Sequence, residues 1–165
     1  MNKKVLALFC LLCFTRFSWA AIGLAVDPGE VILKDVPLGK VVKVSEIAGE
    51  GMKLKITNKS DSAFTYTIDI LPTAKTTAKL TKGYADIPKV SWITPETREV
   101  RVPAHSEKEV ELYLKIPKSK KYYNKNYQAI IEVKSKKNRP EELFVLACQL
   151  RVCLSTNAGG KNAPK

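Results

Sequence analysis

The feature that most limits the fold of this chain is a set of short runs in which apolar and polar residues alternate. In one example, Met52, Leu54 and Ile56 alternate with lysine and threonine, so that one face of an extended strand is apolar. Turn residues separate the runs, and no helical period competes with them over a useful length. We therefore predict an all-β fold, a two-layer antiparallel sandwich of about seven strands. Three further runs share the two-residue period: Phe64, Tyr66, Ile68 and Ile70; Val110, Leu112, Leu114 and Ile116; and Tyr127, Ala129, Ile131 and Val133.

Two turn sequences predict how neighbouring strands are connected. Residues 58–61, Asn-Lys-Ser-Asp, separate the run that begins at Met52 from the run that begins at Phe64. We interpret these two runs as the strands of a hairpin. Residues 103–106, Pro-Ala-His-Ser, separate two later runs in the same way, and we interpret them as a second hairpin turn.

Three other segments complete the predicted architecture. Runs 30–33 and 40–44 each follow a turn that contains proline and glycine, and together they form a split first edge strand. The stretch 72–88 is longer than an ordinary connection, so it either covers one end of the sandwich or has a function of its own. A charged hairpin, 134–142, leads into the last strand, 143–154.

The alternation also predicts which side chains fill the core. Cys148 shares its alternation with Phe144, Leu150 and Val152, so we interpret it as a small core residue. Cys153 falls on the opposite face of the same strand and is the better candidate for a free or intermolecular thiol. The core residues that we predict are Leu54, Ile56, Tyr66, Ile68, Leu112, Leu114, Ile131 and Leu146.

The first twenty residues have the pattern of an export signal. Lys3 and Lys4 give a basic start and an apolar run follows, and Ser18 and Ala20 then place small residues at the two positions that a signal peptidase reads, for cleavage after Ala20. The apolar run is shorter than the ~20 residues that cross a bilayer, and no later segment replaces it. We expect a signal peptide at 1–20, one domain at 21–154 and a disordered tail at 155–165. The mature protein should lack a transmembrane segment and be extracytoplasmic, in the periplasm, on the cell surface or secreted.

The charge of the chain predicts the chemistry of its partners. The formal net charge is +12, and loss of Lys3, Lys4 and Arg16 with the signal leaves +9. Such a balance favours anionic partners outside the membrane, such as wall polymers, lipid headgroups or acidic proteins. The alternative is that lysines spread along the chain only keep the protein soluble and protect its edge strands. We expect no nucleic acid among the partners.

The sequence offers few residues for catalysis. His105 is the only histidine, which excludes a multi-histidine metal site, and its place in a turn indicates a solvated side chain. No Gly-x-Ser-x-Gly elbow, phosphate-binding loop or dinucleotide fingerprint occurs. We therefore predict no catalytic residue, no metal and no cofactor, and we expect that the protein is not an enzyme.

One surface segment combines lysines with tyrosines. Aromatic faces could stack on a ligand there while ammonium groups neutralise phosphate or carboxylate. In the alternative interpretation, the rings only brace a loop. Tyr127 precedes Ala129 by two residues, as the tyrosine of an immunoglobulin corner precedes its cysteine, so we assign it a structural role. The predicted ligand-binding residues are Lys118, Lys120, Lys121, Tyr122, Tyr123 and Lys125.

The order of these features resembles bacterial extracytoplasmic immunoglobulin-like domains. The resemblance covers most of residues 24–154 and implies an immunoglobulin-like β-sandwich. The nearest types are the peptidoglycan-binding domain of WxL-interacting surface proteins and, more distantly, the first domain of periplasmic pilus chaperones. Such a chaperone would carry a second sandwich domain, for which 145 mature residues leave no room. The segments that carry the resemblance are 54–60, Trp92 and Ile93, the turn at 103–106, the strand end at Ile116 and Pro117, and the strand of Tyr127.

Two functions are consistent with this sequence. In the first, a non-catalytic binding module of the bacterial envelope recognises an anionic polymer or acidic partner through the basic tyrosine loop. In the alternative, a structural or chaperone-like assembly subunit pairs an edge strand with another surface or pilus protein. The first mechanism predicts binding that weakens at high salt, and the second predicts binding that persists. The oligomeric state is left open.

Overall fold

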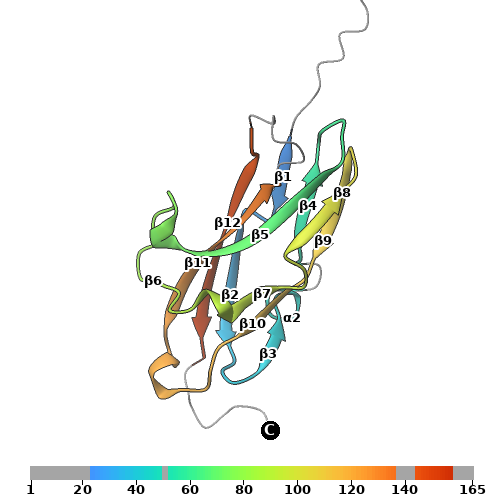
Figure 1. The fold of residues 1–165 in the computed structure, drawn as a ribbon. Coiled ribbons are helices and arrows are strands. Elements are labelled where there is room, and N and C mark those ends of the chain that lie inside the picture. Colours follow the sequence, from blue (N-terminus) through green and yellow to red (C-terminus); the bar gives the residue numbers. More distant parts are fainter. Residues whose placement is uncertain (1–22, 50–51, 137–143, 158–165) are drawn as a thin grey trace, which may run out of the picture.

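The computed structural model describes residues 23–49, 52–136 and 144–157. Among these residues there are twelve strand segments, one short α-helix and three single-turn 3-10 helices (Figure 1). The predicted signal peptide, part of the charged hairpin and most of the predicted tail lie outside the described residues. The strands are β1 (Leu24–Asp27), β2 (Glu30–Val36), β3 (Val41–Lys43), β4 (Leu54–Asn58), β5 (Phe64–Pro72), β6 (Ala85–Asp86), β7 (Ile93–Pro95), β8 (Glu99–Val102), β9 (Ser106–Val110), β10 (Leu112–Lys115), β11 (Asn126–Ser135) and β12 (Ala147–Thr156), and the helices are α2 (Val44–Ala48), η2 (Thr73–Lys75), η3 (Val90–Trp92) and η4 (Lys120–Tyr122).

The strands form a large sheet and two smaller ones. The large sheet has the order β2-β12-β11-β5-β8, with β6 added beside β11. The smaller sheets have the orders β1-β4-β9 and β3-β10-β7. The paired strands are antiparallel except that β2 runs parallel to β12 and β6 runs parallel to β11. Twelve segments replace the roughly seven predicted strands because the chain breaks several strands where it moves between sheets.

The core lies between the large sheet and the two small ones. Seven of the eight predicted core residues are at most 2% exposed, and this confirms the interpretation of the alternating runs. The eighth, Leu146, is only partly buried because β12 begins one residue later, at Ala147. The expected start of the last strand near residue 143 is therefore wrong, and Phe144 is 78% exposed rather than buried.

The hairpins predicted at the turns 58–61 and 103–106 are wrong, whereas β11 and β12, which flank the predicted charged hairpin, pair antiparallel as expected. Strand β4 pairs with β1 and β9, whereas β5 pairs with β11 and β8. The turn between β4 and β5 therefore crosses from one layer of the sandwich to the other, and so does the turn between β8 and β9. An alternating strand has one apolar face in either layer, so its pattern does not determine which strand lies beside it.

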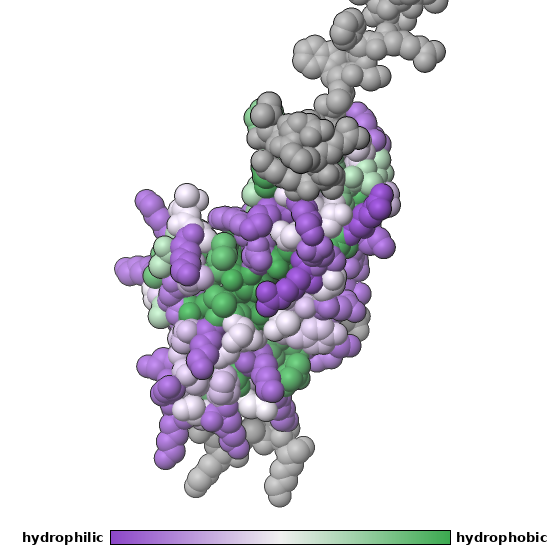
Figure 2. Space-filling model, viewed as in Figure 1, coloured by the Kyte–Doolittle hydropathy of each residue, from purple (hydrophilic) through white to green (hydrophobic). Residues whose placement is uncertain are grey.

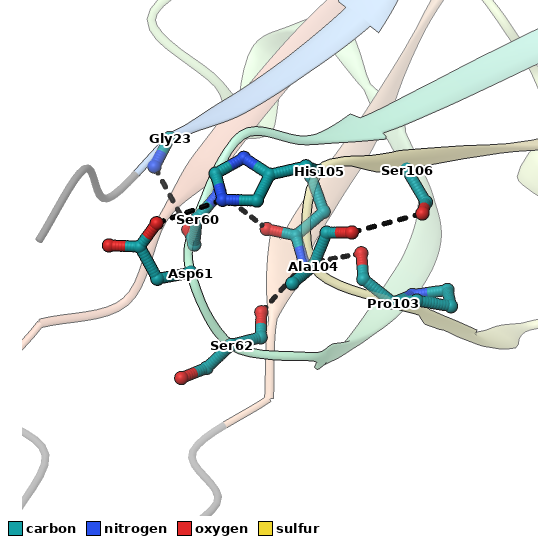
Figure 3. A network of polar contacts seen from close by, with 9 residues as sticks. Gly23, Ser60, Asp61, Ser62, Pro103, Ala104, His105 and Ser106 are labelled. Atoms are coloured by element: carbon teal, nitrogen blue, oxygen red, sulfur yellow. Dashed lines mark hydrogen bonds and ion pairs between the residues drawn. The ribbon is translucent and has the colours of Figure 1, made fainter.

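The two crossing turns are bonded to each other at one end of the sandwich (Figure 3). The side-chain amide of Asn58, which is fully buried, donates to the carbonyl oxygens of Ser62, Val102 and Pro103 at 2.8, 3.2 and 2.9 Å. The Nε2 of His105 lies 2.8 Å from Oδ1 of Asp61. His105 is exposed, as expected, and these contacts give the turn a structural role.

The stretch 73–86 folds over the outer face of β11 and β12. The Oε1 of Gln128 accepts a hydrogen bond from the backbone N–H of Thr81, and its Nε2 donates to the carbonyl oxygen of Lys79. Gln128 is fully buried by this cover, and Cys153 is 3% exposed. The two cysteine predictions are therefore reversed, since Cys148 is only half-buried. Burial raises the pKa of the Cys153 thiol.

The first strand is split, as the sequence predicts. Strand β2 forms an edge of the large sheet, and β3 forms an edge of a small sheet beside β10. An earlier segment that the sequence analysis missed, β1, precedes both and pairs with β4. The chain moves from β1 to β2 across Pro28 and Gly29, so the N-terminal segment contributes to both layers of the sandwich.

Candidate functional site

One half of β12 presents an unpaired backbone edge. The strand pairs with β11 along its whole length, but it pairs with β2 only from Arg151 onward. The backbone N–H of Ser135 donates to the carbonyl oxygen of Leu146 on the β11 side, and the N–H of Arg151 donates to Gly29 on the β2 side. Because these directions alternate along a strand, the N–H and C=O groups of Ala147 and Gln149 point to the β2 side. No described strand pairs with them there.

Apolar side chains adjoin this open half of β12. Phe144 is 78% exposed and Val145 is 46% exposed, immediately before the strand begins. Both precede the residues whose backbone groups lack a strand partner. An exposed strand edge with neighbouring large apolar side chains is the usual setting for contact with another chain.

Strand β1 lies beside the same part of β12 (Figure 1). The Sγ of Cys148 donates to the carbonyl oxygen of Leu24 at 3.5 Å, which joins the two strands across the border of the sandwich. In the described structure β1 pairs with β4 alone, so it is an edge strand of its own sheet. Two edges, one from each layer, therefore meet on this border.

Charged side chains of the large sheet form ion pairs between neighbouring strands. Nη1 of Arg151 lies 3.3 Å from Oε1 of Glu30 where β2 begins, and Nζ of Lys134 lies 2.8 Å from Oδ2 of Asp69. The hydrogen bond and charge of Asp69 raise the pKa of the Lys134 ammonium. The Arg151–Glu30 pair borders the open half of β12, whereas the Lys134–Asp69 pair joins β11 to β5.

The predicted tyrosine and lysine loop forms η4 and the residues around it. The ring of Tyr122 packs edge-on against Trp92, with 4.8 Å between the ring centroids, and Tyr123 packs partly against the core. Trp92 also packs against Tyr127, which is buried. The packing of Tyr122 and Tyr123 therefore braces the loop.

The lysines of this loop remain at the surface. Lys118, Lys120, Lys121 and Lys125 are exposed, and none forms an ion pair within the described ranges. The ammonium of Lys121 lies over the ring of Tyr122, 4.8 Å from its centroid. The predicted lysines of this loop are thus exposed, while Tyr122 is partly occupied by packing against Trp92.

Other kinds of site are not found in the described residues. No three side chains of His, Cys, Asp or Glu among them gather closely enough to hold a metal ion. Within the same residues, no helix has the length and apolar character needed to cross a membrane.

Comparison with known proteins identifies the fold. No family model matches the chain, and no curated protein matches it. A PapD-like domain of human CEP192 superposes with a TM-score of 0.54 at 8% identity, covering 83% of this chain and 87% of that domain. The periplasmic chaperone SfaE has a TM-score of 0.52 at 13% identity, covering 86% of this chain and 61% of its own. A chain of the Salmonella enterica complex of SafA pilin with the SafB chaperone has a TM-score of 0.54 at 9% identity, covering 84% and 56%.

These similarities show a shared fold. This chain spans about three-fifths of the length of the chaperone structures that it resembles. The predicted resemblance to the first domain of pilus chaperones is thus confirmed at the level of the fold. The chain is an immunoglobulin-like β-sandwich whose structural neighbours include PapD-like domains.

Proposed function

We propose that the chain binds a segment of another extracytoplasmic protein by adding it as a β-strand to the open half of β12. The observation that carries this proposal is that the backbone groups of Ala147 and Gln149 face outward beside the exposed Phe144 and Val145. In strand addition, main-chain hydrogen bonds provide affinity and alternate side chains provide specificity. The open half of β12 has main-chain groups without a strand partner and exposed apolar side chains next to them, so it offers both contributions.

The open edge and the side chains beside it can contribute several kcal/mol to binding. Ala147 and Gln149 present two donors and two acceptors, and each hydrogen bond contributes about 0.5–1.5 kcal/mol net. Covering an exposed phenylalanine such as Phe144 contributes about 1.5–3 kcal/mol more. An added strand has to end near Gly29, because β2 occupies the edge from Arg151 onward.

The similar structures support a role in assembly outside the cytoplasm. Two of them are named as chaperones, and one contains a pilin bound to its chaperone. We infer that residues 1–20 direct export, that residues 21–154 form the binding domain, and that the function is not enzymatic. The partner is then a surface or pilus protein. Resemblance to the peptidoglycan-binding domain of WxL-interacting proteins stays a prediction.

The proposal is tested by two variants of one residue. Gln149→Pro removes the outward N–H without removing a bond to β11, whereas Gln149→Ala keeps that N–H and removes only the side chain. A photoreactive amino acid at position 144 in the exported protein should crosslink to a partner in the cell envelope. The crosslink should persist at high salt and in Gln149→Ala, and it should disappear in Gln149→Pro. An unchanged crosslink in Gln149→Pro would rule out strand addition at β12.

A second function is favoured by the basic loop. We infer that Lys118, Lys120, Lys121 and Lys125 form, with Tyr122 and Tyr123, a surface that binds an anionic envelope polymer. The exposed and unpaired state of the lysines supports this inference. Because Tyr122 packs on Trp92, its replacement would also disturb the fold, so lysine variants are the cleaner probe.

Cosedimentation with isolated cell-wall sacculi tests this second function. The protein should pellet at low salt and remain in solution at high salt, and Lys118→Ala/Lys120→Ala/Lys121→Ala should lose the low-salt pelleting. Lys108→Ala, which changes an exposed lysine of β9, serves as the control. Pelleting that is insensitive to salt, or equal in the triple variant, would contradict an electrostatic mechanism.

A further inference from the structure

A second surface feature lies on the far side of β11 from β12. A hollow of about 460 Å³ separates the end of β5 from the segment that leads into η3. Ile70, Leu71 and Pro72 form one wall, and Ile87, Pro88 and Val90 form the other. Figure 2 shows an apolar area between β5 and β7 on this face, bordered by hydrophilic side chains. We name this hollow the β5–η3 groove.

The walls of the β5–η3 groove are held in place by Asp86. Its Oδ1 accepts a hydrogen bond from the N–H of Thr73 at 2.7 Å, and its Oδ2 accepts one from the N–H of Ala74 at 3.0 Å. The next residue, Ile87, donates its N–H to the carbonyl oxygen of Gln128 at 2.9 Å. The end of β5 and the opposite wall are thus joined through one carboxylate. A ligand would meet a groove that is already formed.

The rim of the groove is basic. Lys75 and Lys89 border it from opposite walls, and no carboxylate is among its lining residues. Neither lysine forms an ion pair in the described part of the chain. Val90 at the rim is 37% exposed, and Ile70 and Leu71 are partly exposed. Apolar walls between two unpaired ammonium groups favour a ligand in which an apolar group has a negative charge next to it.

We propose that the β5–η3 groove binds an apolar side chain of a partner protein whose neighbouring residues are acidic. The volume lies within the range of ligand pockets, and the apolar walls supply the burial. The two lysines orient the segment by pairing with carboxylates on either side of the buried side chain. This site is separate from the open half of β12, because β11 lies between β5 and β12 in the sheet.

Three synthetic peptides test the chemistry of the groove. The first is Asp-Asp-Leu-Phe-Asp-Asp, the second replaces its acidic residues with lysine, and the third replaces Leu-Phe with Ser-Ser. In amide NMR spectra of the folded domain, the first peptide should shift the signals of Ile70, Leu71, Ile87 and residues 89–91, and the other two should not. Equal binding of the lysine peptide, or shifts confined to other surfaces, would overturn the proposal.

Matched variants separate the groove from other basic surfaces. Lys75→Glu/Lys89→Glu should weaken binding of the acidic peptide by about tenfold or more. Lys82→Glu, an exposed lysine of the same connection that does not line the groove, should leave binding unchanged. Gln149→Pro should also leave it unchanged, so failure of strand addition at β12 and failure of this proposal give different results. A dimer of the protein alone that Val90→Asp abolishes would identify a second copy as the occupant and overturn the acidic partner.

Discussion

At the scale of single residues, two buried side-chain amides hold the turns and the covering connection of this sandwich in place. Asn58 joins the two turns that cross between the layers, and Gln128 fixes the connection that covers β11. Both are fully buried, in positions that the sequence analysis assigned to a turn and to the polar face of a strand. Alternation identifies apolar positions well, but it does not show which polar side chains find enough hydrogen-bonding partners to be buried.

Replacement of Asn58 should destabilise the whole fold. Asn58→Ala leaves the carbonyl oxygens of Ser62, Val102 and Pro103 without this donor, and it leaves the N–H of Ser60 without its acceptor. We expect a loss of about 2–3 kcal/mol in the free energy of unfolding, measured by urea denaturation. Lys108→Ala, which changes an exposed lysine of β9, should alter it by less than about 0.5 kcal/mol. Equal effects of the two variants would contradict the role of Asn58 in joining the two turns.

The two cysteines should differ in reactivity. Burial raises the pKa of the Cys153 thiol, so a smaller fraction of this thiol is present as the reactive thiolate. Cys148 is only half-buried. Mass spectrometry of the folded domain treated with iodoacetamide at pH 8 should show modification at Cys148 first and at Cys153 only after unfolding. Comparable rates at both sites would contradict the burial of Cys153.

The same pKa shift predicts how stability depends on pH. The unfolded state releases the Cys153 proton at a lower pH than the folded state does, so the free energy of unfolding should fall as pH rises through this interval. Cys153→Ala should reduce the fall above about pH 9. An unchanged pH dependence in Cys153→Ala would show that another group is responsible.

At the scale of elements, the sequence predicts strands and their buried faces better than it predicts their partners. The predicted apolar residues of β4, β5, β10 and β11 belong to the core or pack against it, yet β4 and β5 lie in different layers. The two turns do not enforce a hairpin, because hydrogen bonds of Asn58 stabilise a crossing between layers instead. The connection 73–86 covers part of the sandwich, but it covers an outer face, which no alternation in its own sequence indicates.

The connection should loosen when Asp86 is replaced. Asp86→Ala removes the acceptor of the Thr73 and Ala74 N–H groups, and hydrogen bonds to a charged group contribute about 1.5–3 kcal/mol each. We expect faster hydrogen exchange in residues 73–82, with protection in β11 retained, as measured by hydrogen–deuterium exchange. Glu107→Ala, at an exposed residue of β9, is the control. Unchanged hydrogen exchange in residues 73–82 would contradict the role of Asp86 in holding this connection in place.

At the scale of the whole molecule, the sequence predicts the basic loop but not the open edge of β12. The lysines are visible in the sequence, and their exposure needs no tertiary information. The edge depends on where β2 stops pairing, on β1 joining the other layer and on Phe144 lying outside the core. These are consequences of how distant segments pack, so a local pattern could not reveal them.

Charge and open edges together predict the solution behaviour of residues 21–165. The formal net charge of +12 for the chain becomes +9 without residues 1–20, and it keeps copies apart at low ionic strength, although Phe144, Val145 and the edge of β12 are exposed on each copy. Salt at about 0.5 M shortens the screening length to a few ångströms, so repulsion weakens while backbone pairing persists. Sedimentation velocity should therefore show self-association that grows with salt and is reduced in both Gln149→Pro and Phe144→Asp. Self-association that instead decreases with salt would show that ion pairs, rather than this edge, hold the copies together.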